Sequence, residues 1–194
     1  MSFFAELLLY AVLALTAENI IFSAGVGLSR ALRAARKPHS LLPYAGLVTF
    51  FSLLLSICGV AFTPLLRTND WLFFFSPVLF AVGMALFYCL SVLILRQFCP
   101  RIYARIRAIL APAAINCIVL SMPFLSRILN MGWAGAIGFS LGTGIAFLLA
   151  ALILREAIES FQDPAVPRSF QGLPAALLYA GLFSMAMAGF LGMG

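Results

Sequence analysis

Charged side chains are scarce in this sequence. Of its 194 residues only 9% are charged and 64% are apolar, whereas a soluble domain carries about 25% charged residues. One histidine and four cysteines are present, without a C-x-x-C pair, a Ser/His/Asp set, a phosphate-binding loop or a dinucleotide fingerprint. These absences exclude a soluble enzyme, a disordered tail and a nucleic-acid-binding domain. They also leave no self-contained active site, so any catalysis would require other subunits.

Long apolar runs make up most of the chain instead. A membrane-spanning helix needs about 20 consecutive apolar residues, and six runs meet this length: 3–28, 42–66, 71–95, 106–125, 133–154 and 173–193. The first run lacks a basic leading segment and is too long for a signal peptide, so we expect no cleavage. We predict an all-α integral membrane protein with six transmembrane helices, forming a single membrane domain over residues 1–194.

The charge of the connecting loops alternates along the chain. The loops after the first and third runs are rich in arginine, and the loop after the fifth run carries two arginines with three acidic residues, whereas those after the second and fourth carry one arginine each, Arg67 and Arg127. Cationic loops stay on the cytoplasmic side of a membrane. We therefore predict that the first, third and fifth loops are cytoplasmic and that both termini lie outside. The same rule explains the net charge of +6 without nucleic acid as a partner.

This topology turns the second three runs upside down relative to the first three. The predicted inverted repeats cover about 1–98 and 99–194. The first run of each repeat contains an asparagine, Asn19 or Asn116. Residues that break or bend helices accompany both asparagines: Gly25 and Gly27 in the first repeat, and Pro112 and Pro123 in the second. We therefore predict that the first and fourth helices are interrupted near the membrane midplane, where inverted-repeat proteins often place a site.

Four polar residues lie at these predicted interruptions: Glu18, Asn19, Asn116 and Cys117. A carboxylate inside a membrane costs several kcal/mol unless it is paired, protonated or facing water. Glu18 therefore either contacts a cation or proton, or is a hydrogen-bonded support of the broken helix. The two asparagines are expected to bridge backbone groups freed by the breaks.

The remaining cysteines and the histidine carry no comparable signal. Cys58, Cys89 and Cys99 are expected to be small core residues. His39 lies in a basic loop and is expected to be solvated.

Several motifs resemble those of one membrane family. The segment 154–174 contains R-E-A-I-E and V-P-R-S-F-Q-G-L-P, and an apolar helix with A-G-L-F-S-M-A follows it. Asn116-Cys117 is similar to a T-T-N-C motif, and the stretch from Glu18-Asn19 to Gly27 is similar to a V-N-N…G-hydrophobic-C motif. Together they resemble the Rnf/Nqr membrane subunits, in the branch that holds the Rnf A-subunit and the Nqr E-subunit.

The resemblance implies a membrane subunit of an ion-translocating electron-transport complex in the plasma membrane of a bacterium or archaeon. In this family a homologous partner subunit, together with further subunits, completes the complex. The two homologous subunits share a [2Fe–2S] cluster, with one cysteine from the first helix and one from the fourth helix of each. Cys117 would be the fourth-helix ligand in this chain.

The first-helix ligand position is occupied by Ser29, and Ala113-Ala114 replace the T-T of the fourth-helix motif. Serine is a poor replacement because its alkoxide is harder than a thiolate and its pKa is far higher. Three explanations are open: a Ser-ligated or partner-completed cluster, a paralogue that lost the cluster, or a different site built around Glu18. A cluster-free paralogue would act as an ion or small-solute transporter, with Glu18, Asn19 and Asn116 along its path, or as a structural subunit.

Overall fold

The computed structural model describes residues 3–16, 20–23, 25–36, 40–160 and 172–191. Within these ranges the chain forms ten helices and no strand. The helices are α1 (Phe3–Leu15), α2 (Ile20–Ser23), α3 (Leu28–Ala35), α4 (Leu41–Thr68), α5 (Asp70–Phe74), α6 (Ser76–Phe98), α7 (Pro100–Ala114), α8 (Cys117–Ile128), α9 (Trp133–Ser160) and α10 (Leu173–Leu191). The predicted all-α class therefore agrees with the structure.

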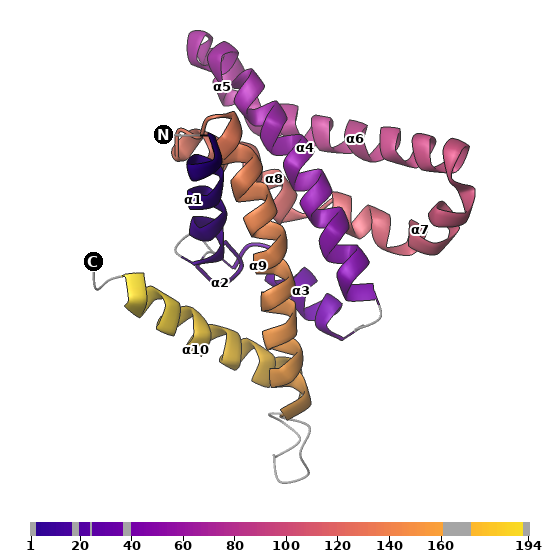
Figure 1. Cartoon of the computed structure of the whole chain (residues 1–194), viewed down its shortest axis with the longest axis vertical. Coiled ribbons are helices and arrows are strands. Elements are labelled where there is room, and N and C mark those ends of the chain that lie inside the picture. Colours follow the sequence, from indigo (N-terminus) through magenta and orange to yellow (C-terminus); the bar gives the residue numbers. More distant parts are fainter. Residues whose placement is uncertain (1–2, 17–19, 24, 37–39, 161–171, 192–194) are drawn as a thin grey trace.

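Two long helices, α4 and α9, form the centre of the molecule. They pack on each other, α1 packs on α9, and α7 and α8 pack on α4 (Figure 1). Phe51, Phe139 and Phe147 are almost fully buried in this region. Ser56 on α4 also lies 3.0 Å, oxygen to oxygen, from Ser126 on α8, which is a hydrogen-bonding distance. A hydroxyl pair of this kind ties apolar helices together where no water is present.

Glycines on α9 allow α1 to approach closely. A Cβ at Gly138 would meet the backbone of Leu7, with 2.9 Å to its carbonyl carbon, and a Cβ at Gly142 would meet Ala11 in the same way. Such stripes of small residues are how membrane helices bring their backbones into contact.

Three of the described helices, α4, α6 and α9, are long and apolar enough to cross a membrane. A fourth crossing results if α7 and α8, which are bent by 48° at their junction, form one broken span. The described apolar parts of α1 and α10 are shorter. The chain is therefore a membrane-embedded, multi-pass helical protein.

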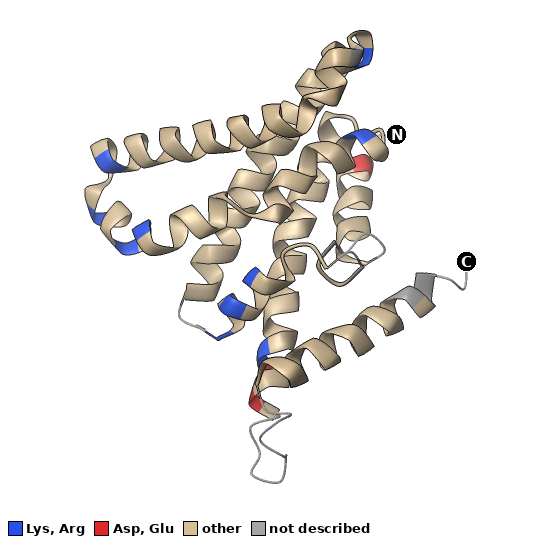
Figure 2. Ribbon diagram, turned by 180° about the vertical axis from the view of Figure 1, so that it is seen from behind, with Lys and Arg blue, Asp and Glu red and all other residues tan. Residues whose placement is uncertain are grey.

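Two basic segments predicted as loops are largely helical. α3 carries Arg30 and Arg33 within the predicted first loop, and α7 begins at Pro100 rather than at residue 106. Proline suits the first turn of a helix, and arginine is a good helix former. The predicted third loop thus shrinks to a turn at Cys99. Figure 2 shows basic residues on α3, around the turn between α6 and α7 and near the ends of α4 and α8, and basic and acidic residues together at the end of α9.

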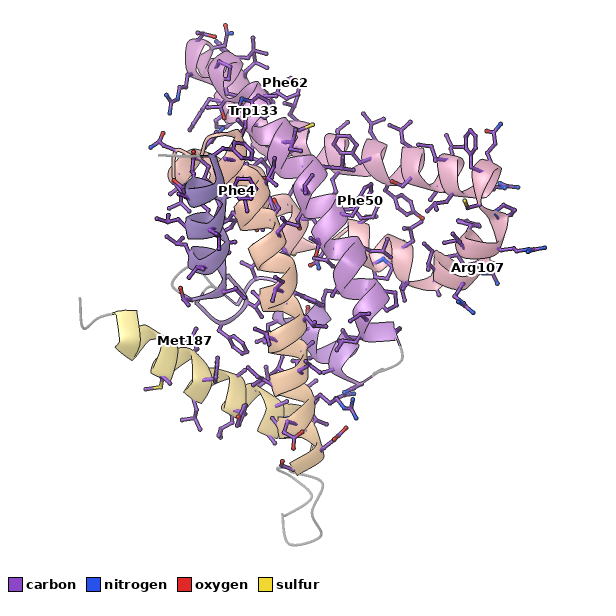
Figure 3. The ribbon with its side chains drawn as sticks, viewed as in Figure 1. Phe4, Phe50, Phe62, Arg107, Trp133 and Met187 are labelled. Carbon is purple, nitrogen blue, oxygen red and sulfur yellow. The ribbon has the colours of Figure 1, made fainter. Side chains whose placement is uncertain are left out.

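The α6–α7 hairpin and α10 extend away from the central pair (Figure 1). Of the 23 residues of α6, only Ser76 and Phe80 are buried. Large apolar side chains cover much of the outer surface of the molecule, and Figure 3 shows Phe4, Phe50 and Phe62 among them. Lipid or neighbouring apolar protein is the surrounding that such a surface requires.

Candidate functional site

The first helix interruption is built from glycine. α2 ends at Ser23, and Gly25 and Gly27 then adopt left-handed backbone angles, with φ of +67° and +79°. Glycine adopts these angles without the steric cost that a Cβ would add. α3 begins immediately afterwards at Leu28, and the amide of Arg30 donates to the carbonyl of Gly27 over 2.9 Å.

The second interruption lies between α7 and α8. α7 ends at Ala114, and Ile115 and Asn116 leave the helical conformation, with Asn116 extended. The Asn116 Oδ1 accepts a bond from the amide of Ile118 over 3.4 Å and so caps α8. Asn116 was predicted to bridge freed groups across the break, whereas its described bond lies within its own half-helix. Asparagine is among the best residues for this capping role.

The two interruptions lie against each other. A Cβ at Gly27 would overlap the Ile118 side chain and would lie 3.5 Å from the Asn116 Oδ1. Segments about 90 residues apart in the chain therefore meet at one junction, and Gly27 is needed there both for its angle and for its lack of a side chain.

Hydroxyl groups from other helices bind carbonyls that the interruptions set free. The Tyr44 hydroxyl on α4 donates to the carbonyl of Pro112 over 2.9 Å, and the Ser184 hydroxyl on α10 donates to the carbonyl of Phe22 over 2.6 Å. Each carbonyl lies one turn before a break, where its usual partner four residues on is displaced. Broken helices in membranes depend on such replacement bonds.

Sequence reasoning missed Tyr44 and Ser184. Both are isolated hydroxyl-bearing residues inside or beside apolar runs, and this was the available signal. Many serines and tyrosines share that signal, however, and most of the serine bonds here return to the residue's own helix. Which hydroxyl reaches a break depends on how the helices pack.

The two predicted cluster-ligand positions occupy equivalent places. Cys117 is the first residue of α8, Ser29 is the second residue of α3, and both are exposed. The free amides of a helix's first turn give that end a partial positive charge, which favours anionic ligands such as thiolates. Ser29 also lines a hollow of about 440 Å³ together with Arg33, Arg36 and Leu173 from α10. Cys117 is not among the described residues that line it.

The other predicted site residues divide into two groups. Glu18 and Asn19 lie outside the described residues. Asn116 is 3% exposed, and its Nδ2 is buried with no hydrogen-bond partner in the described part of the chain. An amide donor in this state is costly, so it calls for an acceptor from outside the described residues.

The remaining cysteines do not form a metal site. No group of three or more His, Cys, Asp or Glu side chains able to hold a metal lies within the described ranges. Cys58 is half-buried on α4, whereas Cys89 and Cys99 are exposed. The prediction that all three are core residues is therefore wrong for Cys89 and Cys99, because α6 and its following turn have little protein packed around them.

Comparison with known proteins matches the chain to one family of membrane subunits. Residues 7–194 match the sequence profile of a family described as Rnf-Nqr subunit, membrane protein. The A-subunit of the ion-translocating oxidoreductase complex of Syntrophotalea carbinolica is 27% identical over 188 residues, which cover 97% of each chain. The A-subunit of the Na⁺-translocating ferredoxin:NAD⁺ oxidoreductase complex of Acetobacterium woodii is 24% identical, over 93% of this chain and 94% of that protein. A proton-translocating counterpart from Clostridium ljungdahlii is 30% identical over 62% of each chain.

Proposed function

Because the chain belongs to the Rnf-Nqr family of membrane subunits, we propose that it serves as the A-subunit of an ion-translocating electron-transport complex. The similar proteins named above are subunits of complexes that translocate ions, two of them coupled to ferredoxin and NAD⁺. The match covers almost the whole chain, including both helix interruptions. The proposed location is the plasma membrane of a bacterium or archaeon, and the proposed partners are a homologous membrane subunit and the other subunits of the complex.

We also propose that the chain crosses the membrane six times as two inverted repeats, about 1–98 and 99–194, with both termini outside. Packing supports this assignment, because the broken first span lies on α9 and the broken fourth span lies on α4. Each half thus places its interrupted span on the long helix of the other half. The charges of the connecting segments supply the orientation.

The junction between the two interruptions is the observation that carries the proposed function. It brings the beginnings of α3 and α8 to one region through Gly27, Asn116 and Ile118. Two half-helix N-termini that converge there favour an electron-rich group. We propose that Cys117 is the residue of this chain that takes part in electron transfer at that junction, in contact with the homologous subunit.

The donor set at the junction is incomplete for a [2Fe–2S] cluster. Such clusters are held by four ligands, nearly always thiolates, and this chain offers the thiol of Cys117 and the hydroxyl of Ser29. These residues do not fit half of a four-thiolate site. If a cluster is present, further ligands must come from the partner or Ser29 must act as an unusual ligand.

Ser29 itself favours a second candidate function. A paralogue without a cluster could use the same junction as a path for an ion or small solute, lined by Glu18, Asn19 and Asn116, or serve as a structural subunit. The Asn116 Nδ2, buried without a partner among the described residues, would gain an acceptor from a group that entered the junction.

Purification from native membranes with the associated subunits tests these candidates. We expect iron, a [2Fe–2S] signal by electron paramagnetic resonance, and loss of that signal together with electron transfer in Cys117→Ala. Cys89→Ala, on the exposed face of α6, is the matched control and should behave as wild type. Ser29→Cys should increase the iron content if the site is only one thiolate short.

A complex that assembles without iron, and whose electron transfer survives Cys117→Ala, would contradict the redox role. In that case the chain is tested alone in liposomes for ion flux, with Glu18→Gln as the variant that should abolish it. Absence of flux would leave the structural role.

A further inference from the structure

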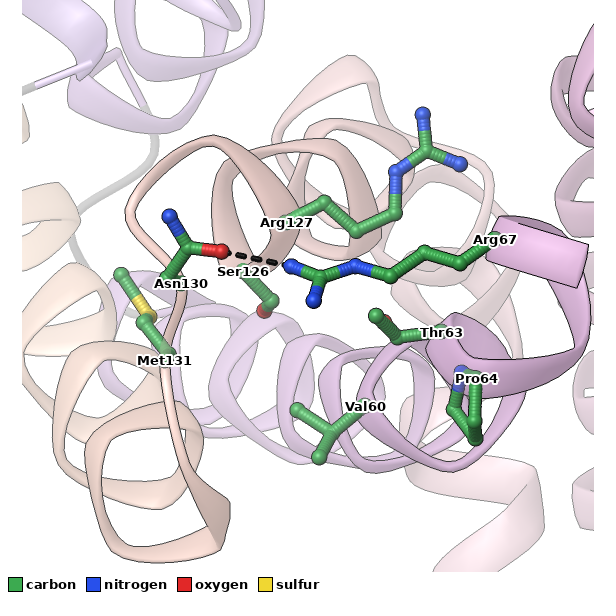
Figure 4. A pocket seen from close by; sticks show the side chains of 8 residues that line it. All are labelled: Val60, Thr63, Pro64, Arg67, Ser126, Arg127, Asn130 and Met131. Carbon is green, nitrogen blue, oxygen red and sulfur yellow. Dashed lines mark hydrogen bonds between the residues drawn. The ribbon is translucent and has the colours of Figure 1, made fainter.

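Two arginines lie close together where α4 and α8 end. Arg67 lies in the last turn of α4, and Arg127 lies in the last turn of α8. Both line a hollow of about 420 Å³ with Thr63, Ser126 and Asn130 (Figure 4). Both also line an adjoining hollow of about 300 Å³. The predicted topology left these two cations as the weak exceptions on their side of the membrane, and nothing in the proposed function uses them.

Among the side chains that the structure describes, which exclude that of Asp70, none neutralises either guanidinium. The Arg67 Nη2 donates to the neutral Asn130 Oδ1 over 2.7 Å. The Arg127 guanidinium lies over the Phe73 ring, 4.8 Å from its centroid, and 5.8 Å from that of Phe124. The one ion pair among the described residues joins Arg155 and Glu159, elsewhere in the molecule.

The Arg127 Nη1 is buried and has no hydrogen-bond partner among the described residues. A guanidinium has five N–H donors. An aromatic ring attracts its positive charge but does not accept hydrogen bonds from all of these donors. The negative ends of α4 and α8 stabilise nearby cations modestly, but they likewise leave the donors free. A buried charged donor without an acceptor calls for an acceptor that the described side chains do not supply.

The local backbone holds these groups in place. At the end of α8, the amide of Met131 donates to the carbonyl of Ser126 over 2.9 Å, and the amide of Asn130 donates to that of Arg127 over 3.1 Å. Asn130 has a φ of +47°. This is the helix-ending arrangement in which Asn replaces the usual glycine. It fixes the Asn130 side chain where it meets Arg67.

Exposed aromatic side chains near the hollow favour a position at the level of lipid headgroups. Trp71, Phe74 and Phe75 are exposed beside the end of α4, and Trp133 is exposed at the start of α9. Figure 3 shows Phe62 and Trp133 near this same end of the molecule. Tryptophan is enriched where a membrane meets water. The ligand that combines negative charge with this level is a lipid headgroup, and arginine is well suited to bind its phosphate.

We propose that Arg67 and Arg127, with Asn130, bind the phosphate of an anionic phospholipid. The lipid's acyl chains would extend along the exposed apolar surface next to the hollow. Binding at this place would clamp the ends of α4 and α8 together.

The test uses the full chain, purified with any associated subunits in mild detergent and depleted of lipid. Phosphatidylglycerol, phosphatidylcholine and inorganic phosphate are titrated separately, and bound lipid is counted by native mass spectrometry alongside thermal unfolding. We expect phosphatidylglycerol to bind and stabilise the wild type, and the double variant Arg67→Gln/Arg127→Gln to bind it about tenfold more weakly.

The matched control is Arg101→Gln/Arg105→Gln on the exposed part of α7, which removes the same charge elsewhere. It should retain wild-type affinity, and both double variants should unfold at the wild-type temperature in phosphatidylcholine. Arg67→Lys/Arg127→Lys, which keeps the charge, should retain part of the affinity.

If Arg101→Gln/Arg105→Gln lost as much affinity for phosphatidylglycerol as Arg67→Gln/Arg127→Gln, net charge alone would explain the effect. That result would overturn the proposal. Binding of phosphatidylcholine as tight as that of phosphatidylglycerol would also overturn it. Stabilisation by inorganic phosphate as large as that by phosphatidylglycerol would assign the hollow to a soluble oxyanion instead of a lipid.

Discussion

Single hydroxyl groups make the helix interruptions tolerable in a membrane. Tyr44 and Ser184 bind the carbonyls of Pro112 and Phe22, which the breaks would otherwise leave unpaired. An unpaired carbonyl in an apolar surrounding costs several kcal/mol, so each bond matters more than a surface hydrogen bond would.

Removal of the Tyr44 hydroxyl tests this role. Tyr44→Phe keeps the ring, which packs 5.4 Å from the ring of Phe147, centroid to centroid, and deletes the bond to Pro112. We expect a loss of about 1–2 kcal/mol in unfolding free energy, measured by denaturant titration in detergent micelles. Tyr179→Phe on α10, where the side chain is exposed, is the control and should change little. Equal stability of Tyr44→Phe and wild type would show that the carbonyl is satisfied in another way.

Residue patterns predicted where one of the two breaks lies. Asn116 was placed at an interruption of the fourth apolar run, and α7 and α8 are separated there, although its described bond caps α8 instead of bridging the break. The partner of that break was not predictable, because the contact between Gly27 and Ile118 joins positions distant in sequence.

At the scale of helices, close packing between α1 and α9 depends on glycine. Gly138 faces the backbone of Leu7, and Gly142 faces that of Ala11. The apolar runs predicted both helices. They did not predict that the glycines of α9 face the backbone of α1.

Adding one methyl group at this contact should separate the two helices. Gly138→Ala would place its Cβ against the Leu7 backbone, which has no side-chain flexibility with which to yield. We expect a loss of about 1–3 kcal/mol in stability, observed as a lower unfolding temperature. Gly181→Ala on α10, where a Cβ meets nothing within 4 Å, should be neutral or slightly stabilising because alanine favours helix. A neutral Gly138→Ala would mean that α1 and α9 are less closely packed.

At the scale of the whole molecule, the orientation of the chain in the membrane is inferred from the positive charge of its connecting segments. The turn between α6 and α7 contains the exposed Cys99 and is flanked by Arg96 and Arg101. Positive-inside placement therefore predicts that Cys99 faces the cytoplasm.

A variant that retains Cys99 as its only cysteine tests this orientation. A membrane-impermeant maleimide should label it in inside-out vesicles and not in intact cells. Thr68→Cys in a cysteine-free background, at the exposed end of α4, should give the reverse pattern. Labelling of Cys99 from outside the cell would invert the proposed topology.

Composition and the lengths of the apolar runs by themselves determined that the chain is helical and membrane-embedded, and where most of its long helices lie. This was possible because a bilayer requires long uninterrupted apolar segments, and those are local properties of a sequence. Local charge, however, misled the assignment of α3 and the start of α7, since arginine is compatible with both loops and helices. Only the tertiary structure decided that the two interruptions meet, that Tyr44 and Ser184 satisfy their carbonyls, and that Arg67 and Arg127 share a hollow. These features depend on groups brought together across the fold, and the packing of α1, α4, α8 and α9 determines those distances.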